Sequence, residues 1–143
     1  MTVLLDQLSK LFMVGHLALG QSVPVIPGVF HFTLIYNTGI AFGFFQNSGL
    51  LLFAVISLSI VLLILAGPRL AGDGLSAQIS MALILGGALG NWIDRCRVHA
   101  VIDFLDFQVW PVFNIADSAI TVGVGLYLLK FVCDKFRKST PAS

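Results

Sequence analysis

The chain contains no glutamate and has few charged residues of any kind. All seven acids are aspartates, and charged residues make up 10% of the 143 residues, whereas a typical soluble domain has about 25%. Hydrophobic residues account for 57% of the chain, and the mean hydropathy is +0.96. This composition excludes an ordinary soluble domain and predicts an integral membrane protein.

The chain also lacks the broad basic patch that nucleic-acid binding would need. The only basic cluster lies near the C-terminal end and consists of Lys130, Lys135, Arg137 and Lys138. A cluster in that place is typical of an anchor beside a membrane span. We therefore expect membrane lipids as partners and no nucleic acid.

Four apolar segments are candidates to cross a bilayer, which takes about 20 residues. They are residues 1–20, 48–67, 74–94 and 112–131. The first contains Asp6 and Lys10 at i and i+4, on one helix face, where the two charges can neutralise each other. Gly86 and Gly90 on the third segment predict close helix packing. We predict one all-α membrane domain with four transmembrane helices.

Cysteine and histidine offer no catalytic thiol and no metal site. Cys96 and Cys133 fall at opposite ends of the third and fourth apolar segments, which argues against a disulfide between them. The three histidines, His16, His31 and His99, do not have the spacing of metal ligands. We expect no metal and no cofactor.

The distribution of basic residues predicts the orientation in the membrane. Segment 67–74 carries Arg69 and the tail carries the basic cluster, whereas the opposite side has only Arg95 and Arg97. Because basic residues are enriched on the cytoplasmic side, both termini are predicted to be cytoplasmic. Segments 21–49 and 94–111 then lie at the outer face.

The first outer segment is more than a plain loop. Residues 30–37 partly alternate, with aromatic or apolar side chains at 30, 32, 34 and 36. This pattern predicts a short β-like segment at the membrane interface, with turns at Pro24, Pro27-Gly28 and Thr38-Gly39. The second outer segment, residues 104–110, is similarly amphipathic.

Asp117 is the only charge between residues 112 and 129. A carboxylate in the middle of a bilayer costs about 2.5–3.5 kcal/mol on insertion scales, so an acid in such a segment suggests function. Interaction with the helix dipole offsets only about 0.3–1 kcal/mol. A second acid, Asp103 or Asp106, lies in the outer segment just upstream. Two carboxylates that meet at the outer face can perform acid–base chemistry.

The remaining polar residues fall into short groups that the predicted topology brings mostly to the outer face. The groups are Asp6-Gln7-Leu8-Ser9-Lys10, Asn37-Thr38-Gly39-Ile40-Ala41-Phe42-Gly43, Gly90-Asn91-Trp92-Ile93-Asp94-Arg95, Val101-Ile102-Asp103-Phe104 and Phe113-Asn114-Ile115-Ala116-Asp117-Ser118. Through the combination and order of these five groups, the chain resembles the lipoprotein signal peptidase family (signal peptidase II). The members of this family are bacterial aspartyl membrane proteases. The resemblance covers nearly the whole chain.

The resemblance implies an enzyme of the bacterial cytoplasmic (inner) membrane that cleaves diacylglyceryl-modified prolipoproteins before the lipidated cysteine. It implies that Asp103 and Asp117 are the catalytic pair, with Asp106 a flanking residue. We expect the enzyme to act as a monomer. The residues implied to support the site or bind substrate are Asn37, Asn91, Arg95 and Asn114. Those expected to be structural are Asp6, Lys10 and Asp94, the last as an interfacial ion pair with Arg95.

Two departures from the family pattern affect these expectations. Family members carry a longer apolar stretch before the first polar group, and the stretch between the two catalytic motifs is short in this chain. We therefore expect a smaller outer loop over the site.

Two other classes of protein remain open. A small proton-coupled transporter could also use intramembrane Asp residues, although its acids should lie near the midplane rather than at one face. A non-catalytic assembly subunit would explain the glycine spacing but not the paired acids.

Overall fold

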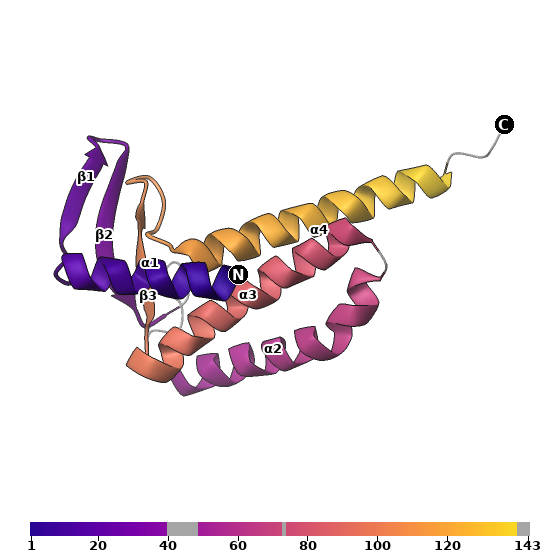
Figure 1. Cartoon of the computed structure of the whole chain (residues 1–143), viewed down its shortest axis with the longest axis horizontal. Helices are drawn as coiled ribbons and strands as arrows, with labels where there is room; N and C mark the ends of the chain where they lie inside the picture. The colour runs from indigo at the N-terminus through magenta and orange to yellow at the C-terminus, as the bar shows by residue number, and fades with distance from the viewer. Residues whose placement is uncertain (40–48, 73, 140–143) are drawn as a thin grey trace.

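The computed structural model describes residues 1–39, 49–72 and 74–139, and in this part the chain is mostly helical with one small sheet (Figure 1). The elements in chain order are α1 (Thr2–His16), β1 (Ser22–Ile26), β2 (Phe30–Asn37), α2 (Gly49–Ala71), α3 (Leu75–Val98), β3 (Val101–Asp106) and α4 (Ile115–Ser139). Helices therefore occur at all four segments predicted to span. The structure does not describe residues 40–43 of the predicted second polar group.

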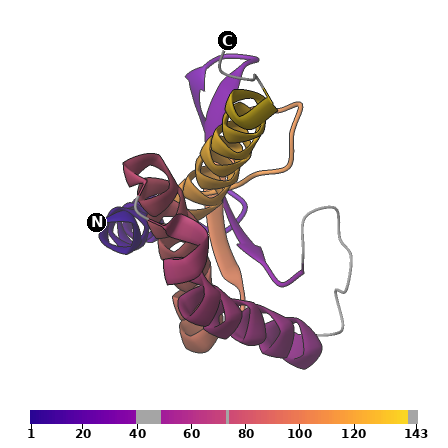
Figure 2. The ribbon, with the colours of Figure 1, turned by 90° about the vertical axis from the view of Figure 1, so that its right-hand side faces the viewer.

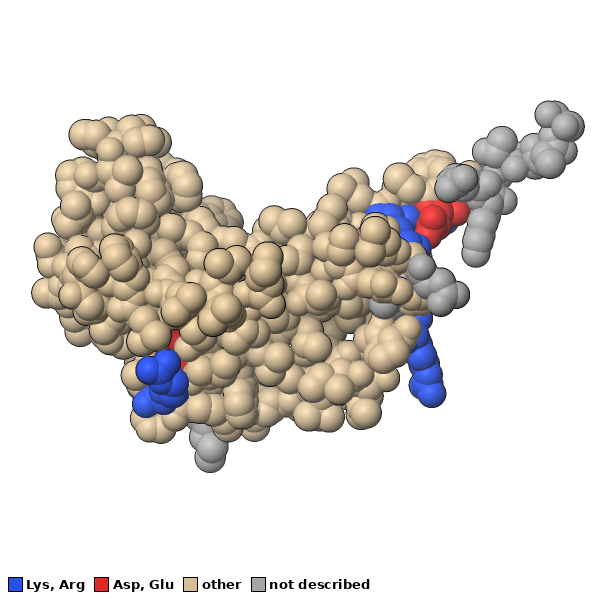
Figure 3. Space-filling view, in the orientation of Figure 1, with Lys and Arg blue, Asp and Glu red and all other residues tan. Residues whose placement is uncertain are grey.

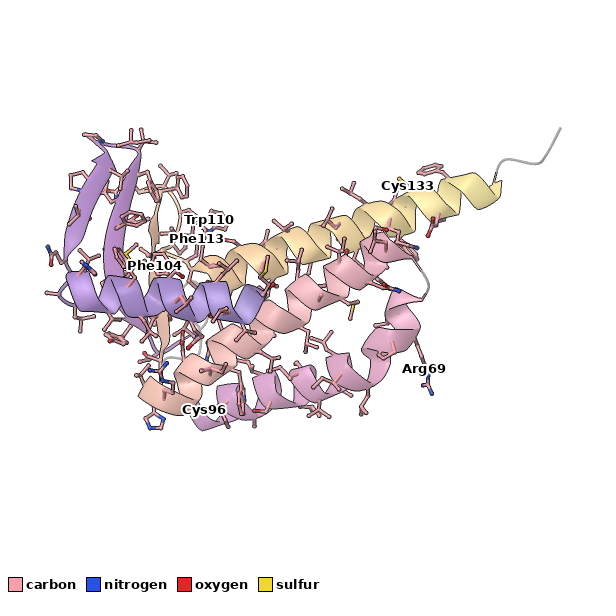
Figure 4. All side chains as sticks on the ribbon, in the orientation of Figure 1. Arg69, Cys96, Phe104, Trp110, Phe113 and Cys133 are labelled. Carbon is pink, nitrogen blue, oxygen red and sulfur yellow. The ribbon has the colours of Figure 1, made fainter. Side chains whose placement is uncertain are left out.

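The sheet lies at one end of the helices, where α3 ends and α4 begins (Figure 1). Helix α3 is central, because it contacts α1, α2 and α4. Figure 2 shows the same helices from one end of the molecule. Cys96 and Cys133 are both free, and Figure 4 shows them at opposite ends of the helices, as the sequence predicts.

Small residues allow α3 to approach its neighbours closely. A Cβ added at Gly86 would lie 2.8 Å from the Cβ of Thr2, and one at Gly90 would lie 2.5 Å from Oδ2 of Asp6. A Cβ at Gly87 would collide with the backbone carbonyl of Ala116. The two predicted packing glycines thus allow α1 to approach α3 closely, and Gly87 allows α4 to do the same.

Two of the described helices are long and apolar enough to cross a membrane by length and composition. The stretches are Phe53–Leu70 in α2 and Ile115–Phe136 in α4, and only 11% and 17% of their residues are buried inside the protein. Large apolar side chains such as Leu62, Leu65 and Leu129 are more than half exposed. Such apolar exposure suits contact with lipid. Figure 3 shows Lys and Arg side chains near the two ends of the molecule, with an uncharged surface between them.

Helix α2 continues past the predicted end of its segment at residue 67. Pro68 lies inside the helix, which ends at Ala71 and bends near this end (Figure 1). Proline lacks the N–H that the helix ladder needs, so a bend is its usual effect.

The predicted β-like segment is the middle strand of a three-stranded antiparallel sheet with the order β1-β2-β3. The predicted turn at Pro27-Gly28 is confirmed: Gly28 has a φ of 72°, and the N–H of Val29 donates to the carbonyl of Ile26 at 3.0 Å. The predicted turn at Pro24 is wrong. Pro24 lies within β1, an edge strand, where a missing N–H is tolerated.

A small apolar core fixes the sheet to the helices. Met13 of α1, Leu34 of β2, and Ile102 and Phe104 of β3 are buried together. The register of β2 and β3 pairs Ile35 with Asp103. The core therefore holds β3, and with it Asp103, beside the start of α4.

Candidate active site

The start of α4 is fixed by two reciprocal hydrogen bonds. The backbone N–H of Asp117 donates to Oδ1 of Asn114 at 2.9 Å, and the N–H of Asn114 donates to Oδ2 of Asp117 at 3.2 Å. Asn114 precedes the first helical residue, and Asp117 is the third residue of the helix, so the pair forms a capping box. This local motif sets the position of the Asp117 carboxylate.

Two buried asparagines join Asp117 to Asp103. Nδ2 of Asn114 donates to Oδ1 of Asp103 at 2.7 Å and lies 3.0 Å from Oδ1 of Asn91. Nδ2 of Asn91 in turn donates to Oδ1 of Asp117 at 2.8 Å. The two acids identified in the sequence thus belong to one hydrogen-bonded network formed by α3, β3 and α4.

Asn37 completes the hydrogen bonding of Asp103. Its Nδ2 donates to Oδ2 of Asp103 at 3.0 Å, from the neighbouring strand. Its own Oδ1 accepts the N–H of Gly39 at 3.0 Å, at the turn predicted after β2. Each oxygen of Asp103 therefore accepts one amide donor.

The environment of Asp103 raises its pKa from 3.8 to about 7. Burial is the largest cause, because the carboxylate is only 2% exposed and loses its hydration, and the nearby charge of Asp117 acts in the same direction. Hydrogen bonds from Asn37 and Asn114 and the positive charge of Lys10 lower the pKa and only partly offset the burial. Near neutral pH, this carboxyl can either hold or release a proton.

Lys10 forms the centre of a buried charge cluster next to this network. Its Nζ lies 2.9 Å from Oδ2 of Asp6 and 2.6 Å from Oδ2 of Asp94, and all three side chains are at most 1% exposed. It also donates to Oδ1 of Asn91 at 3.0 Å. The predicted pairing of Asp6 with Lys10 is confirmed. The predicted ion pair of Asp94 with Arg95 is wrong, because Asp94 turns inward to Lys10.

The two aspartates of the cluster also bind backbone groups of other elements. Oδ1 of Asp6 accepts the N–H of Ala116 at the start of α4, at 2.9 Å. Oδ2 of Asp94 accepts the N–H of Ile102 in β3, at 3.2 Å. The cluster therefore connects α1 and α3 to the two elements that carry Asp103 and Asp117.

Arg95 lies half-buried beside the two acids. Its guanidinium donates to the carbonyls of Asn91, at 3.4 Å, and of Gly39, at 3.5 Å. Its positive charge interacts with both Asp103 and Asp117. Because arginine does not release its proton, it can orient groups and balance charge but cannot act as an acid or base.

Asp106 and Gln7 have roles that the sequence did not reveal. Asp106 is 8% exposed and accepts a hydrogen bond of 2.6 Å from Oγ1 of Thr33 on β2. It therefore links the end of β3 to the neighbouring strand and is not a solvated loop charge. Nε2 of Gln7 donates to Oδ1 of Asp94 at 2.9 Å and to the carbonyl of Gly90 at 3.1 Å. The sequence signal for this role of Gln7 was its place between Asp6 and Lys10, three positions before the lysine.

An apolar pocket of about 460 Å³ adjoins Asp117. Phe107, Trp110 and Phe113 line it from the loop between β3 and α4, and Val122 lines it from α4. Figure 4 shows Trp110 and Phe113 where this loop meets the start of α4. The site thus combines two linked carboxylates with an adjoining apolar space.

Within residues 1–39, 49–72 and 74–139, no three His, Cys, Asp or Glu side chains are grouped in a way that could hold a metal ion.

Comparison with known proteins gives one consistent family. A family model described as signal peptidase (SPase) II matches residues 1–133. The chain is 41% identical over 127 residues to a lipoprotein signal peptidase of Halothermothrix orenii, which covers 89% of this chain and 87% of the relative. It is 40% identical over 134 residues to a lipoprotein signal peptidase of Brevibacillus brevis, which covers 92% and 90%. A solved bacterial membrane enzyme, determined by the in meso method at 2.3 Å, superposes with a TM-score of 0.90 at 31% identity, covering 99% of this chain and 89% of that chain.

Proposed function

The chain belongs to the signal peptidase II family, and from this premise we propose that Asp103 and Asp117 are the catalytic pair with which it cleaves its substrate. Members of this family remove the signal peptide from prolipoproteins, and this chain is such a protease. The observation that carries the proposal is the Asn114 side chain, which donates to Asp103 and caps the helix that presents Asp117.

The mechanism follows from two carboxylates that share one proton. Close carboxylates do not ionise together easily, so at neutral pH one is charged and the other is neutral. The ionised Asp accepts a proton from a bound water, and that water attacks the scissile carbonyl while the neutral Asp donates its proton to the carbonyl oxygen. When the resulting gem-diol collapses, the acid formed in the first step protonates the leaving amine, and the other Asp takes a proton back from a gem-diol hydroxyl, which restores one proton to the pair. No covalent intermediate and no cofactor is required.

Hydrogen-bond donors around the pair keep this arrangement in place. Asn37 and Asn114 hold the two oxygens of Asp103, while Asn91 holds Asp117. Arg95 orients backbone carbonyls beside the acids and balances their charge. We propose that Asn37, Asn91, Arg95 and Asn114 support the site and contact the substrate backbone, whereas Asp6, Lys10 and Asp94 are structural.

We propose that all four helices insert in the bacterial inner membrane, with both termini in the cytoplasm and the site at the outer face. The distribution of Lys and Arg supports this orientation. The apolar surfaces of α2 and α4 support lipid contact. We propose that the enzyme acts as a monomer, because a single chain already brings Asp103 and Asp117 together with their amide donors Asn37, Asn91 and Asn114.

The substrate is proposed to be a diacylglyceryl-modified prolipoprotein, cleaved just before the lipidated cysteine. The test is to incubate the purified full chain with a diacylglyceryl-modified signal-peptide substrate and to map the cleaved bond by mass spectrometry. Cleavage before the lipidated cysteine, unaffected by EDTA or by an alkylating agent, is expected. Loss of activity with EDTA would indicate a metalloprotease and overturn the two-aspartate mechanism.

The same assay addresses the alternative of a proton-coupled transporter, which the family relationship does not favour. Both acids lie at one end of the helices, beside the sheet, rather than halfway along a span (Figure 1). A transporter would leave the lipopeptide intact and would move protons across vesicles that contain the purified chain.

A further inference from the structure

The pocket beside Asp117 is built from a preformed aromatic wall. The rings of Phe107 and Phe113 stack with centroids 5.9 Å apart, and Phe107 also packs against Phe30 of β2 at 4.9 Å. The backbones of Leu105 and Phe113 exchange hydrogen bonds of 2.8 and 3.0 Å, which tie the end of the loop back to the sheet. The wall is therefore fixed to the same sheet that carries Asp103.

The pocket continues onto the surface of α4 that faces lipid. Val122 lines the pocket and is 53% exposed. Leu126 and Leu129 follow at i+4 and i+7, on the same helix face, and are also exposed. Figure 3 shows the molecule hollowed between the sheet end and α4. An apolar path thus leads along α4 from the lipid to Asp117.

We infer that this pocket binds a hydrocarbon chain of the lipid-modified cysteine and so places the scissile bond against the two aspartates. The inference rests on the proposed function, because that cysteine directly follows the bond to be cut. Its acyl chain must extend from the catalytic pair towards the hydrocarbon of the membrane. The pocket and the exposed face of α4 lie along that direction.

The size of the pocket favours an acyl chain over a side chain of the signal peptide. An engineered cavity of about 150 Å³ accommodates benzene, which has six carbons. A pocket of about 460 Å³ offers roughly three times that space, which suits a long chain rather than a short aliphatic side chain. Phe107, Trp110, Phe113 and Val122 offer an acyl chain dispersion contacts, whereas the polar lining residues, Asp117, Ser118 and Thr121, all belong to the first two turns of α4.

The test compares two valine variants of α4. Val122→Trp fills the pocket, whereas Val124→Trp places the same ring on an exposed position of the helix that does not line the pocket. Each variant is assayed on lipopeptides of one sequence with acyl chains of decreasing length. We expect Val122→Trp to lower kcat/KM for the long-chain substrate by about tenfold or more, mainly through KM. The loss should shrink as the chains shorten, and Val124→Trp should behave like the wild-type chain.

Three results would overturn the inference. Equal effects of the two variants would show that the pocket does not select substrate. A loss from Val122→Trp that does not depend on chain length would exclude an acyl chain as the occupant. A loss that follows the size of the residues before the cysteine would assign the pocket to the signal peptide instead. If the wild-type chain cleaves no lipopeptide, the proposed function fails, which is a different outcome from all three.

A binding measurement keeps the inference testable if Val122→Trp does not fold. Asp103→Asn is used to retain intact substrate, and acyl chains brominated near the cysteine are used to quench tryptophan fluorescence. We expect quenching by the brominated lipopeptide that is mostly lost when Trp110→Phe is added, because Trp110 lines the pocket. Unchanged quenching in the Trp110→Phe variant would contradict the inference.

Discussion

Nδ2 of Asn114 lies 2.7 Å from Oδ1 of Asp103, and the same asparagine caps the helix that presents Asp117. One side chain therefore sets the geometry of both acids. Its side-chain oxygen accepts the N–H of Asp117 in α4, and its side-chain nitrogen donates to Asp103 in β3. Because Asn114 is completely buried, no water can replace either contact without rearrangement.

The two contacts of Asn114 can be separated by substitution. Asn114→Ala should lower cleavage by about 100-fold and destabilise the protein by about 0.5–2 kcal/mol, because it removes both the donor to Asp103 and the helix cap. Asn114→Ser retains a capping oxygen but has no amide to reach Asp103. It should recover most of the stability while activity stays low. Thermal unfolding in detergent and cleavage rates measure the two effects, and full activity of the serine variant would refute the role of the contact.

The pH dependence follows from the raised pKa of Asp103. With a pKa of about 7, its carboxyl is mostly protonated below pH 7 and ionised above it. Since the pair needs one proton, the cleavage rate should fall as pH rises through about 7, with the apparent pKa belonging to the pair. A rate that rises steadily between pH 6 and 9 would contradict the shared proton.

Asn37 should shift that pH profile in a defined direction. Its hydrogen bond stabilises the ionised form of Asp103 and so lowers the pKa. Asn37→Ala should therefore move the alkaline fall of the rate to higher pH, in addition to lowering the maximum. A shift to lower pH in the measured profile would show that the contact acts in the opposite sense.

Much of this site could be predicted from the order of polar residues, because a charge or amide in an apolar chain is costly unless it pairs with another polar group. Asp117 was identified in this way, whereas Asp103 and Asn114 were selected through the family resemblance, and the structure brings the three together. The pairing of Asp94 could not be predicted, since Arg95 is its sequence neighbour on α3, whereas Lys10 lies far away in the sequence, on α1. The rotation of α3 against α1 decides which cation Asp94 meets.

The fold was predictable to a similar extent. Apolar length predicted helices at the right places, and alternation predicted β2. Strand β3 was harder to recognise, because Ile102, Asp103 and Phe104 are buried in succession and show no alternation. Asp106 looked like a solvated charge because its partner, Thr33, lies on a distant part of the sequence.

The buried charge cluster predicts a large stability effect at one lysine. Lys10→Met would leave Asp6 and Asp94 buried without their cation, which should cost about 3–5 kcal/mol. Lys130→Met is the matched control, because Lys130 also pairs with an aspartate at i+4 but is 33% exposed. Its loss should cost at most about 0.5 kcal/mol. Similar midpoints of thermal unfolding for the two variants would show that the cluster does not stabilise the fold.

The proposed orientation can be measured directly. A reporter that is active only in the cytoplasm, fused after Ser143, should be active, and a periplasmic reporter at the same position should be silent. The reason is the basic cluster that follows the last span. The reverse result would place the catalytic pair on the cytoplasmic side and remove its access to exported lipoproteins.

The most direct test of the central claim is the cleavage rate of a diacylglyceryl-modified peptide by three purified asparagine variants. Asp103→Asn and Asp117→Asn keep the size of the side chain but remove the titratable proton, so each should abolish cleavage while the protein stays folded. Asp106→Asn is the matched control from the same strand, and it should retain most activity because Asp106 bonds to Thr33 and Gln108 rather than to the pair. Activity in folded Asp103→Asn or Asp117→Asn, or its absence in folded Asp106→Asn, would contradict the assignment of the catalytic pair.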